Sequence, residues 1–430
     1  MQLTMPLAVA DPTLAQRGAD RSPVAQPRGP VLGLASLVGP RRPVGLPWLF
    51  DHPRRMFTTS GRAAIHAALR ALALPAGSVV SLPRYHCPTL VAPAAALGLD
   101  LQFHPLDALG RPELDALEQA REAAQGHLRV LLAAHWFGRV RSLAREREWC
   151  DRHGIVLIED CAHALFGEAG ERPVGCWGDY ATASLTKFMP VAEGGLLLAA
   201  PGRVLPTLAR PGLRAQAKAL VDVLDRSLEA GRLRGLAWLR PGRRPRPVLA
   251  DQVEQTYPPL QAIASGAAPS PHVAAAQMTA DCDLARVGDA LPLASQVLAL
   301  SLPMARSVAR RRAVFDRLAF GLDGIEGTRV LVMPPGEAPA PYVLAWAFDD
   351  ATAADAVYAV SRAEGLAVFR WDRVWPGTPA VGGDTGTTWQ RCVLQVLCHQ
   401  DLADAQVEHS VQVLGRAARS ALAAPSSTTP

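Results

Sequence analysis

The chain of 430 residues lacks the cysteine spacings of a zinc site or of a disulfide framework. Its seven cysteines form no C-x-x-C pair, and their number is odd. We therefore expect reduced, buried thiols and no metal site. No apolar run approaches the roughly 20 residues of a membrane helix, and residues 1–10 lack the basic and apolar parts of a secretion signal. These absences predict a cytoplasmic protein that does not contact the membrane.

Charge of one sign is also scarce. The 44 Lys and Arg residues against 39 Asp and Glu residues leave a net charge of only +5. Arginine is locally dense around Arg240, Arg243, Arg244 and Arg246, but no aromatic residues are interleaved there. A solvated linker therefore explains this cluster better than a nucleic-acid surface does, and we predict no nucleic-acid partner. The length favours two domains, one large and one small.

Strand and helix patterns alternate from about residue 53 onward. The predicted strands cover residues 79–82, 101–103, 129–134, 155–160, 180–185 and 195–200. The predicted helices cover residues 62–73, 88–97 and 142–153, with one more that begins at 112. This alternation is typical of crossover units around a mostly parallel sheet with both faces covered.

The remaining segments differ from this pattern. We predict a poorly ordered or loosely draped arm over 1–48, the core of the large domain over 49–202, a mainly helical segment with an Arg/Pro-rich linker over 203–302, a small α/β domain over 303–422 and a polar tail over 423–430. Helices are expected at 214–230, 273–290, 304–318, 351–364 and 403–422. Further strands are expected at 329–332 and 343–347, followed by an extended segment at 366–371.

Two neighbouring strands end in residues able to do chemistry. Asp160 closes the strand Val156-Leu-Ile-Glu-Asp160, and Lys187 follows the next strand in Ser184-Leu-Thr-Lys187. Ligands of open α/β sheets bind beyond such strand ends. An acid holds a pyridine nitrogen protonated and an amine forms a Schiff base, so this order predicts a pyridoxal-phosphate (PLP) site. The alternatives are a capping aspartate and a surface lysine.

Further candidates surround this pair. Ser60-Gly61-Arg62 opens a helix, where Gly61 permits close approach of the backbone and the free amides bind phosphate. Arg62 either adds charge there or faces solvent, and the Ser184 hydroxyl is a candidate for the phosphate or for a backbone bond.

His163 is a candidate for contact with the cofactor ring or its oxygen, with a structural histidine as the alternative. Tyr85-His86-Cys87 follows the strand that begins at residue 79, where a side chain could lie over the ring. A turn into the following helix is the alternative.

Together these motifs resemble the DegT/DnrJ/StrS family of PLP-dependent sugar aminotransferases, which have the aspartate-aminotransferase-like fold. The resemblance covers residues 53–200 well, and it covers 304–415 loosely, through Phe369-Arg-Trp371 and Leu397-Cys-His-Gln-Asp401. It is carried by Ser60-Gly-Arg-Ala-Ala-Ile-His-Ala-Ala-Leu69, Leu82-Pro-Arg-Tyr-His-Cys-Pro-Thr89, His135-Trp-Phe-Gly138, Ile158-Glu-Asp-Cys-Ala-His163, Gly178-Asp179, Ser184-Leu-Thr-Lys187 and Glu193-Gly-Gly195.

The resemblance implies a PLP-binding large domain with a mostly parallel sheet and a smaller C-terminal α/β domain. It implies that Lys187 is the Schiff-base lysine and carries the proton, and that Asp160 is the partner of the pyridinium nitrogen. Gly61, Arg62 and Ser184 would hold the phosphate, while His86, Cys87 and His163 would lie beside the ring. Several features depart from the family pattern. Arg62 replaces a threonine, Cys87 replaces an aromatic residue and His163 replaces a glutamine. The segment between Asp179 and Lys187 is short, and Phe188 and Met189 stand where a polar residue is frequent.

The function implied by the resemblance is transfer of an amino group from glutamate or glutamine to a nucleotide-linked keto sugar, in the biosynthesis of amino sugars or polysaccharides. A homodimer is expected. The departures at Cys87 and His163 leave two alternatives open. One is other PLP chemistry, such as dehydration or decarboxylation, and the other is a non-catalytic binding or regulatory protein.

Overall fold

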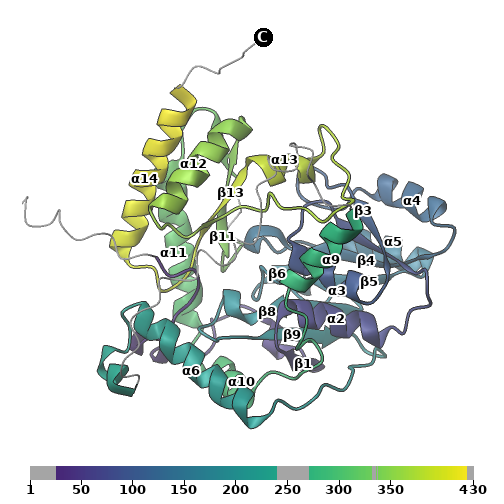
Figure 1. Ribbon diagram of the computed structural model, residues 1–430, viewed down its shortest axis with the longest axis horizontal. Coiled ribbons are helices and arrows are strands. Elements are labelled where there is room, and N and C mark those ends of the chain that lie inside the picture. The colour runs from purple at the N-terminus through teal and green to yellow at the C-terminus, as the bar shows by residue number, and fades with distance from the viewer. Residues whose placement is uncertain (1–25, 240–270, 332–335, 337, 424–430) are drawn as a thin grey trace, which may run out of the picture.

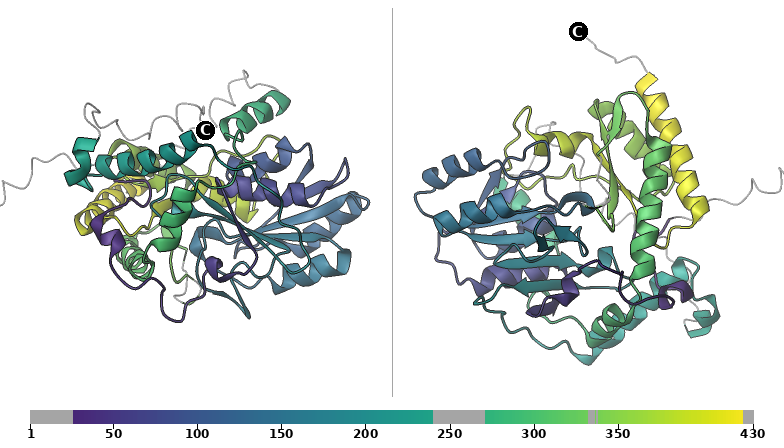
Figure 2. Two further views of the ribbon diagram at one scale, coloured as in Figure 1. Left: turned by 90° about the horizontal axis from the view of Figure 1, so that it is seen from below. Right: turned by 180° about the vertical axis from the view of Figure 1, so that it is seen from behind.

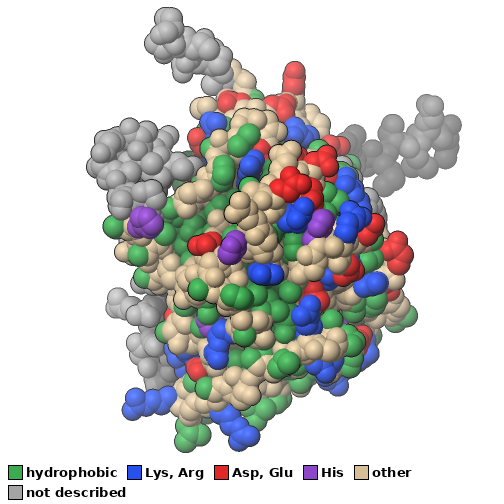
Figure 3. All heavy atoms as spheres, turned by 90° about the vertical axis from the view of Figure 1, so that its right-hand side faces the viewer, with side chains coloured by type: hydrophobic (Ala, Val, Ile, Leu, Met, Phe, Trp, Pro, Cys, Tyr) green, Lys and Arg blue, Asp and Glu red, His purple; other side chains and the backbone are tan. Residues whose placement is uncertain are grey.

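A computed structural model describes residues 26–239, 271–331, 336 and 338–423. Figure 1 shows a large unit around a seven-stranded sheet and a smaller unit around a four-stranded sheet. Among the described helices, none combines the length and the apolar composition that crossing a bilayer requires. On the face shown in Figure 3, acidic and basic side chains are interspersed, and neither sign of charge forms a continuous field.

The seven-stranded sheet confirms the predicted mostly parallel α/β architecture. Its strand order is β1-β9-β8-β5-β4-β2-β3, and β9 runs antiparallel to both of its neighbours. The strands are β1 (Arg55–Thr58), β2 (Val79–Pro83), β3 (Asp100–His104), β4 (Leu128–Ala134), β5 (Val156–Asp160), β8 (Tyr180–Ser184) and β9 (Gly195–Ala199). The reversal at β9 follows from chain length, because the ten residues between β8 and β9 are too few for a crossover.

Helices cover both faces of this sheet (Figure 2), with α2 and α3 on one face and α4 and α5 on the other. Their bounds are α2 (Gly61–Ala71), α3 (Pro88–Ala96), α4 (Leu114–Ala123) and α5 (Ala144–His153). In α2, alanines at helical spacing are buried against β8 and β9, and Ser60 caps the first turn through its side chain. Short elements complete the unit: η1 (Leu34–Leu37), η2 (Leu49–Asp51), η3 (Trp136–Gly138), β6 (Glu168–Ala169), β7 (Arg172–Pro173) and η4 (Leu185–Lys187).

The segment after the large sheet contains α6 (Leu213–Glu229), η5 (Arg234–Leu239), α9 (Pro271–Asp281) and α10 (Leu293–Ser301). The prediction of one helix over 273–290 is wrong. Helix α9 ends at Asp281, and Asp283 has a φ of 48°, which the right-handed helix does not allow. The sequence reading also missed α10. The arginine cluster at Arg240–Arg246 lies outside the described residues.

The smaller unit has an antiparallel sheet with the order β10-β11-β13-β12. Helices α11 and α12 pack on this sheet, and α14 packs on those two helices. The bounds are α11 (Ala305–Leu322), β10 (Thr328–Val330), β11 (Val343–Phe348), α12 (Ala351–Ala363), β12 (Val368–Phe369), α13 (Thr385–Cys392), β13 (Val393–Leu397) and α14 (Asp404–Ala423). The extended segment expected at 366–371 shrinks to the two residues of β12. Helix α13 and strand β13 were not predicted.

The described part of the N-terminal arm corrects the expectation that folded structure begins near Pro53. Gln26 is buried and donates from Nε2 to Ser410 Oγ at 2.7 Å, and the Val31 amide donates to Asp401 Oδ2 at 3.1 Å. Trp48 and Phe50 are buried in the large unit. Residues 26–50 are therefore packed against both units, because their few apolar and polar side chains find specific partners. Residues 1–25 lie outside the described residues.

Candidate active site

A cavity of about 350 Å³ lies at the carboxyl ends of the central strands. It brings together seven of the eight predicted site residues: Gly61, Arg62, Cys87, Asp160, His163, Ser184 and Lys187. Side chains that the sequence reading did not propose complete the wall, among them Thr59, Trp136, Glu193 and Trp371. The eighth predicted residue, His86, does not line the cavity.

Lys187 and Asp160 form the electrostatic centre of the cavity. Burial lowers the pKa of Lys187, while the groups of Cys87 and Asp160 oppose that shift. Burial raises the pKa of Asp160, and the charge of Lys187 opposes the rise. Oδ1 of Asp160 accepts hydrogen bonds from the Ala162 amide at 3.0 Å and from Thr182 Oγ1 at 3.1 Å. These two donors fix the orientation of the carboxyl group at the end of β5.

His163 presents one defined tautomer to the cavity. Its Nδ1 accepts a hydrogen bond from the Phe137 amide at 3.2 Å, so the proton of the neutral ring resides on Nε2. Burial and the neighbouring charge of Lys187 hold the pKa of His163 well below its ordinary value. Nε2 is buried without a hydrogen-bond partner among the described residues. The ring therefore carries a donor that a bound group in the cavity is needed to satisfy.

The start of α2 lies directly against the end of β8. A Cβ added at Gly61 would lie 3.4 Å from the Cβ of Ser184. Ser60 Oγ already accepts from the Ala63 amide, which leaves the amides of Gly61 and Arg62 without partners inside the helix. The Ser184 hydroxyl lies 3.3 Å from Thr186 Oγ1. Two free amides and a hydroxyl thus meet at the positive end of a helix, which suits an anion.

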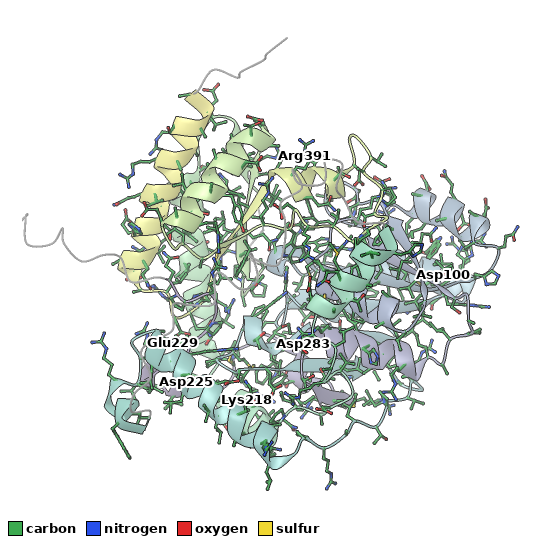
Figure 4. The ribbon with its side chains drawn as sticks, viewed as in Figure 1. Asp100, Lys218, Asp225, Glu229, Asp283 and Arg391 are labelled. Carbon is green, nitrogen blue, oxygen red and sulfur yellow. The ribbon has the colours of Figure 1, made fainter. Side chains whose placement is uncertain are left out.

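Arg62 points partly away from this anion-binding corner. Its Nε donates to the Asp283 carbonyl at 3.1 Å, and NH2 lies 3.6 Å from Asp283 Oδ2. Asp283 follows α9. In Figure 4 it lies apart from the labelled residues of α6, which are Lys218, Asp225 and Glu229. The guanidinium therefore ties the segment after α9 to the rim of the cavity.

The structure separates His86 and Cys87, two of the three residues predicted beside the ring. Cys87 lines the cavity at the start of α3, with Sγ 3.0 Å from Thr89 Oγ1. His86 is fully buried elsewhere. Its Nε2 accepts from the Trp375 amide at 3.0 Å, its Nδ1 donates to the Pro83 carbonyl at 2.8 Å, and its ring stacks on Phe103. His86 is thus a structural residue, and burial lowers its pKa to about 4.

Two aromatic side chains of the smaller unit lie beside Lys187, and one of them, Trp371, lines the cavity. The ring centroid of Tyr342 lies 5.1 Å from Lys187 Nζ and 4.4 Å from the His163 ring. Trp371 lies 6.0 Å from Nζ and 5.1 Å from His163. The sequence reading placed Trp371 only in a loosely matching segment and did not single out Tyr342. Their role depends on how the two units pack, which no local pattern reveals.

Glu159 and His135 form a second buried group behind the cavity. With Cys161 they place three potential metal ligands within 4.8 Å of one another. Both oxygens of Glu159, however, already accept hydrogen bonds, from His135 Nε2 and from the amides of the segment 175–178. The group is therefore a hydrogen-bonded anchor rather than an open metal site. A carboxylate inside an apolar strand was the signal that could have identified it.

Comparison with known proteins agrees with this geometry. Residues 52–207 match the model of the DegT/DnrJ/EryC1/StrS aminotransferase family. Over this segment, about a third of its length, the chain is similar to that family. It is 28% identical over 142 residues to GDP-perosamine synthase of Vibrio cholerae, covering 33% of this chain and 38% of the relative. It is 34% identical over 191 residues to L-glutamine:2-deoxy-scyllo-inosose aminotransferase of Streptomyces kanamyceticus, covering 41% and 42%. The aligned segments thus span about two fifths of each relative.

Solved structures show the same fold over most of the chain. The structure of DesI with its TDP-sugar product has a TM-score of 0.58 at 18% identity, covering 86% of this chain and 82% of that one. The PLP form of Spr1654 from Streptococcus pneumoniae has a TM-score of 0.55 at 15% identity, covering 86% and 88%. At these identities the likeness establishes the fold of the chain.

Proposed function

We propose that the protein is a PLP-dependent aminotransferase that moves an amino group from an amino acid to a polyhydroxylated cyclic ketone. One observation carries this proposal: Lys187 and Asp160 share a cavity with the free amides at the start of α2. Amine, acid and anion site are the three groups that PLP requires of a protein.

The residues present fit the cofactor. Asp160 would pair with the ring nitrogen, and the unpartnered Nε2–H of His163 would donate to a ring oxygen. The Gly61 and Arg62 amides with the Ser184 hydroxyl would hold the phosphate. When bound, PLP supplies an electron sink for the carbanion formed at the amino-acid carbon.

The chain's own work is then to position groups and to move protons. Burial lowers the pKa of Lys187, which increases the neutral fraction that is able to act as nucleophile and base. Lys187 would be the cavity base that carries a proton across the reacting face. Asp160 would pair with the ring nitrogen and stabilise its positive charge, and Trp371 in the cavity wall, with Tyr342 beside Lys187, would exclude water.

The curated relatives suggest the substrates. The printed name of the Streptomyces kanamyceticus relative makes L-glutamine the donor and an inosose the acceptor, whereas GDP-perosamine synthase acts in nucleotide-sugar chemistry. We propose glutamine or glutamate as donor and a nucleotide-linked keto sugar as acceptor, in amino sugar or polysaccharide biosynthesis. A keto cyclitol is the second candidate, because the longer of the two matches is to an inosose enzyme.

The decisive experiment is spectroscopic. The purified protein should be yellow with PLP, and borohydride should bleach it and leave label on the peptide that contains Lys187. Lys187→Ala should take no label, whereas Lys218→Ala, at an exposed ion pair with Asp222, should label normally. Glutamine or glutamate should then convert the bound cofactor to its pyridoxamine form. Failure to take up PLP would favour a non-catalytic protein, and PLP uptake without conversion by any donor would favour dehydration or decarboxylation.

We further propose a homodimer in the cytoplasm. Exposed apolar side chains on two contacting helices, α6 and α10, support the dimer: Leu213 and Leu293 are 88% and 62% exposed. All seven cysteines are described and unpaired, which agrees with a reducing compartment. Light scattering at increasing protein concentration tests the dimer, and a constant monomer mass would contradict it.

A further inference from the structure

A buried arginine of the smaller unit bonds to the backbone of the proposed reactive lysine. Arg311, on α11, is fully buried. Its NH2 donates to the Lys187 carbonyl at 2.6 Å and its NH1 to the Cys398 carbonyl at 2.9 Å. Its Nε donates to Gln400 Oε1 at 2.9 Å. Gln400 in turn donates from Nε2 to the Phe188 carbonyl at 2.9 Å. Two adjacent carbonyls of the lysine segment are thus held by two side chains that also bond each other.

We propose that Arg311 and Gln400 are positioning residues that fix the backbone of Lys187 and thereby aim its amine into the cavity. This inference rests on the proposed function of Lys187 as the Schiff-base lysine. It assigns a task to the smaller unit in the reaction, although Arg311 has no place among the residues that line the cavity.

The lysine segment needs such support because its own structure is short. Lys187 ends the three-residue turn η4, and such turns have poor hydrogen-bond geometry and little stability of their own. Within the loop, the amides of Phe188 and Met189 both bond to the Leu185 carbonyl. The carbonyls of Lys187 and Phe188 point the other way, toward the smaller unit, and receive their donors there.

Arg311 meets the lysine segment through the backbone. Its NH2 donates to the carbonyl of Lys187 and not to the side chain. Burial lowers the pKa of Arg311 to about 10, so the guanidinium remains charged at neutral pH. Its recorded hydrogen bonds go to neutral oxygens, and its plane lies over the Phe188 ring at 4.5 Å. The planar guanidinium donates to several oxygens in fixed directions, which the single ammonium group of a lysine cannot reproduce.

The test compares three variants with the unchanged protein, each stripped of cofactor and then mixed with PLP. Gln400→Glu keeps the acceptor for Arg311, replaces the donor to Phe188 by a carboxylate oxygen and adds a negative charge. Arg311→Lys keeps the positive charge and loses the planar set of guanidinium donors. Arg312→Lys is the matched control, because the neighbouring Arg312 pairs with Asp316 along the same helix at 2.9 Å. The readouts are the rate of PLP capture, the pH midpoint of the bound-cofactor absorbance and the thermal midpoint.

Gln400→Glu and Arg311→Lys should capture PLP on Lys187 roughly tenfold to a hundredfold more slowly than the control, as small misplacements of a reacting group do. Their absorbance midpoints should shift in pH while the folded fraction at the assay temperature stays complete. Capture rates and midpoints equal to those of Arg312→Lys in either folded variant would overturn the inference. If the unchanged protein itself captures no PLP, the proposed function fails, and the inference fails with it.

Discussion

The buried carboxylate of Glu159 accepts a hydrogen bond of 2.9 Å from Nε2 of His135. The next residue in the sequence, Asp160, lines the cavity. Because successive side chains of a strand point to opposite faces, the end of β5 sends one carboxyl group to the cavity and one to the core. Glu159 also accepts the amides of Gly175 and Trp177, at 2.7 Å and 2.8 Å. The carboxylate of Glu159 therefore holds the segment between β5 and β8 in place, while the carboxylate of Asp160 faces the cavity.

Glu159→Gln should lower the free energy of unfolding at pH 7 by about 3–5 kcal/mol, because it removes the charge of a buried, fully bonded group. Burial raises the pKa of Glu159, but the bonds from His135 and the amides outweigh it, and the net pKa lies below the ordinary 4.5. The stabilisation by ionised Glu159 is therefore complete above the pKa that this group has in the unfolded chain. It disappears as the pH falls through the lower pKa of the folded protein. Urea denaturation of the parent and of Glu159→Gln at pH 7 and at about pH 3.5 provides the measurement. The difference between their free energies of unfolding should be smaller at the lower pH.

The control for this prediction is Glu148→Gln, which changes an exposed ion pair with Arg152. That variant should keep the stability of the parent, since exposed pairs contribute little. A Glu159→Gln protein as stable as the control at pH 7 would show that the amides around Glu159 do not need its charge.

Gly195→Ala should disrupt the anion-binding corner. A Cβ at Gly195 would lie 2.1 Å from the Ser60 carbonyl oxygen, so the start of α2 would have to move. We expect a loss of about 1–3 kcal/mol in stability and weaker PLP binding in a folded protein. Gly212 is the matched control, because it has no atom within 4 Å of an added Cβ. Thermal melts and cofactor titration of both variants test this, and equal PLP affinities would contradict it.

Sequence patterns were sufficient for six of the seven strands of the large sheet and missed β1, and the reason for the success is local. Apolar runs such as the one that ends at Asp160, and the helix caps between them, identify the parallel strands and the residues at their ends. Seven of the eight site residues predicted by the same reasoning line the cavity. It failed for His86, because adjacent residues of the loop after β2 point in different directions. Only packing decides that Cys87 faces the cavity and His86 faces Phe103.

Contacts between the two units were beyond the sequence. Tyr342, Trp371 and Arg311 reach the lysine from a part of the chain more than 120 residues away. Trp371 stands only in a loosely matching motif, and Tyr342 and Arg311 stand in none. The N-terminal arm was misread for the same reason: its Pro- and Arg-rich composition suggests disorder, yet Gln26 and Val31 find partners on the smaller unit.

Asp160→Asn should leave a folded protein that binds PLP and turns over about a hundredfold more slowly or worse, because the charge opposite the ring nitrogen is lost. Thr182→Val is the graded companion. It removes one donor to Asp160 Oδ1 and leaves the Ala162 amide in place, so we expect only a few-fold loss. Single-turnover rates with glutamine and glutamate provide the measurement. Equal losses in the two variants would mean that Asp160 acts by its hydrogen bonds and not by its charge.

His163 should serve as a neutral donor across the working pH range. Burial, together with the charge of Lys187, holds the pKa of His163 well below 6.5, so PLP affinity should show no inflection near that pH. Because folding lowers the pKa of His163, the unfolded chain binds a proton at this residue more readily than the folded protein does. The free energy of unfolding therefore falls as the pH drops below 6.5. His163→Gln keeps a donor and should bind PLP within a few-fold of the parent, whereas His163→Leu should bind roughly tenfold more weakly. Spectroscopic titration from pH 5.5 to 8.5 checks both variants, and an affinity in His163→Leu equal to that in His163→Gln would show that the free Nε2–H contributes nothing to binding.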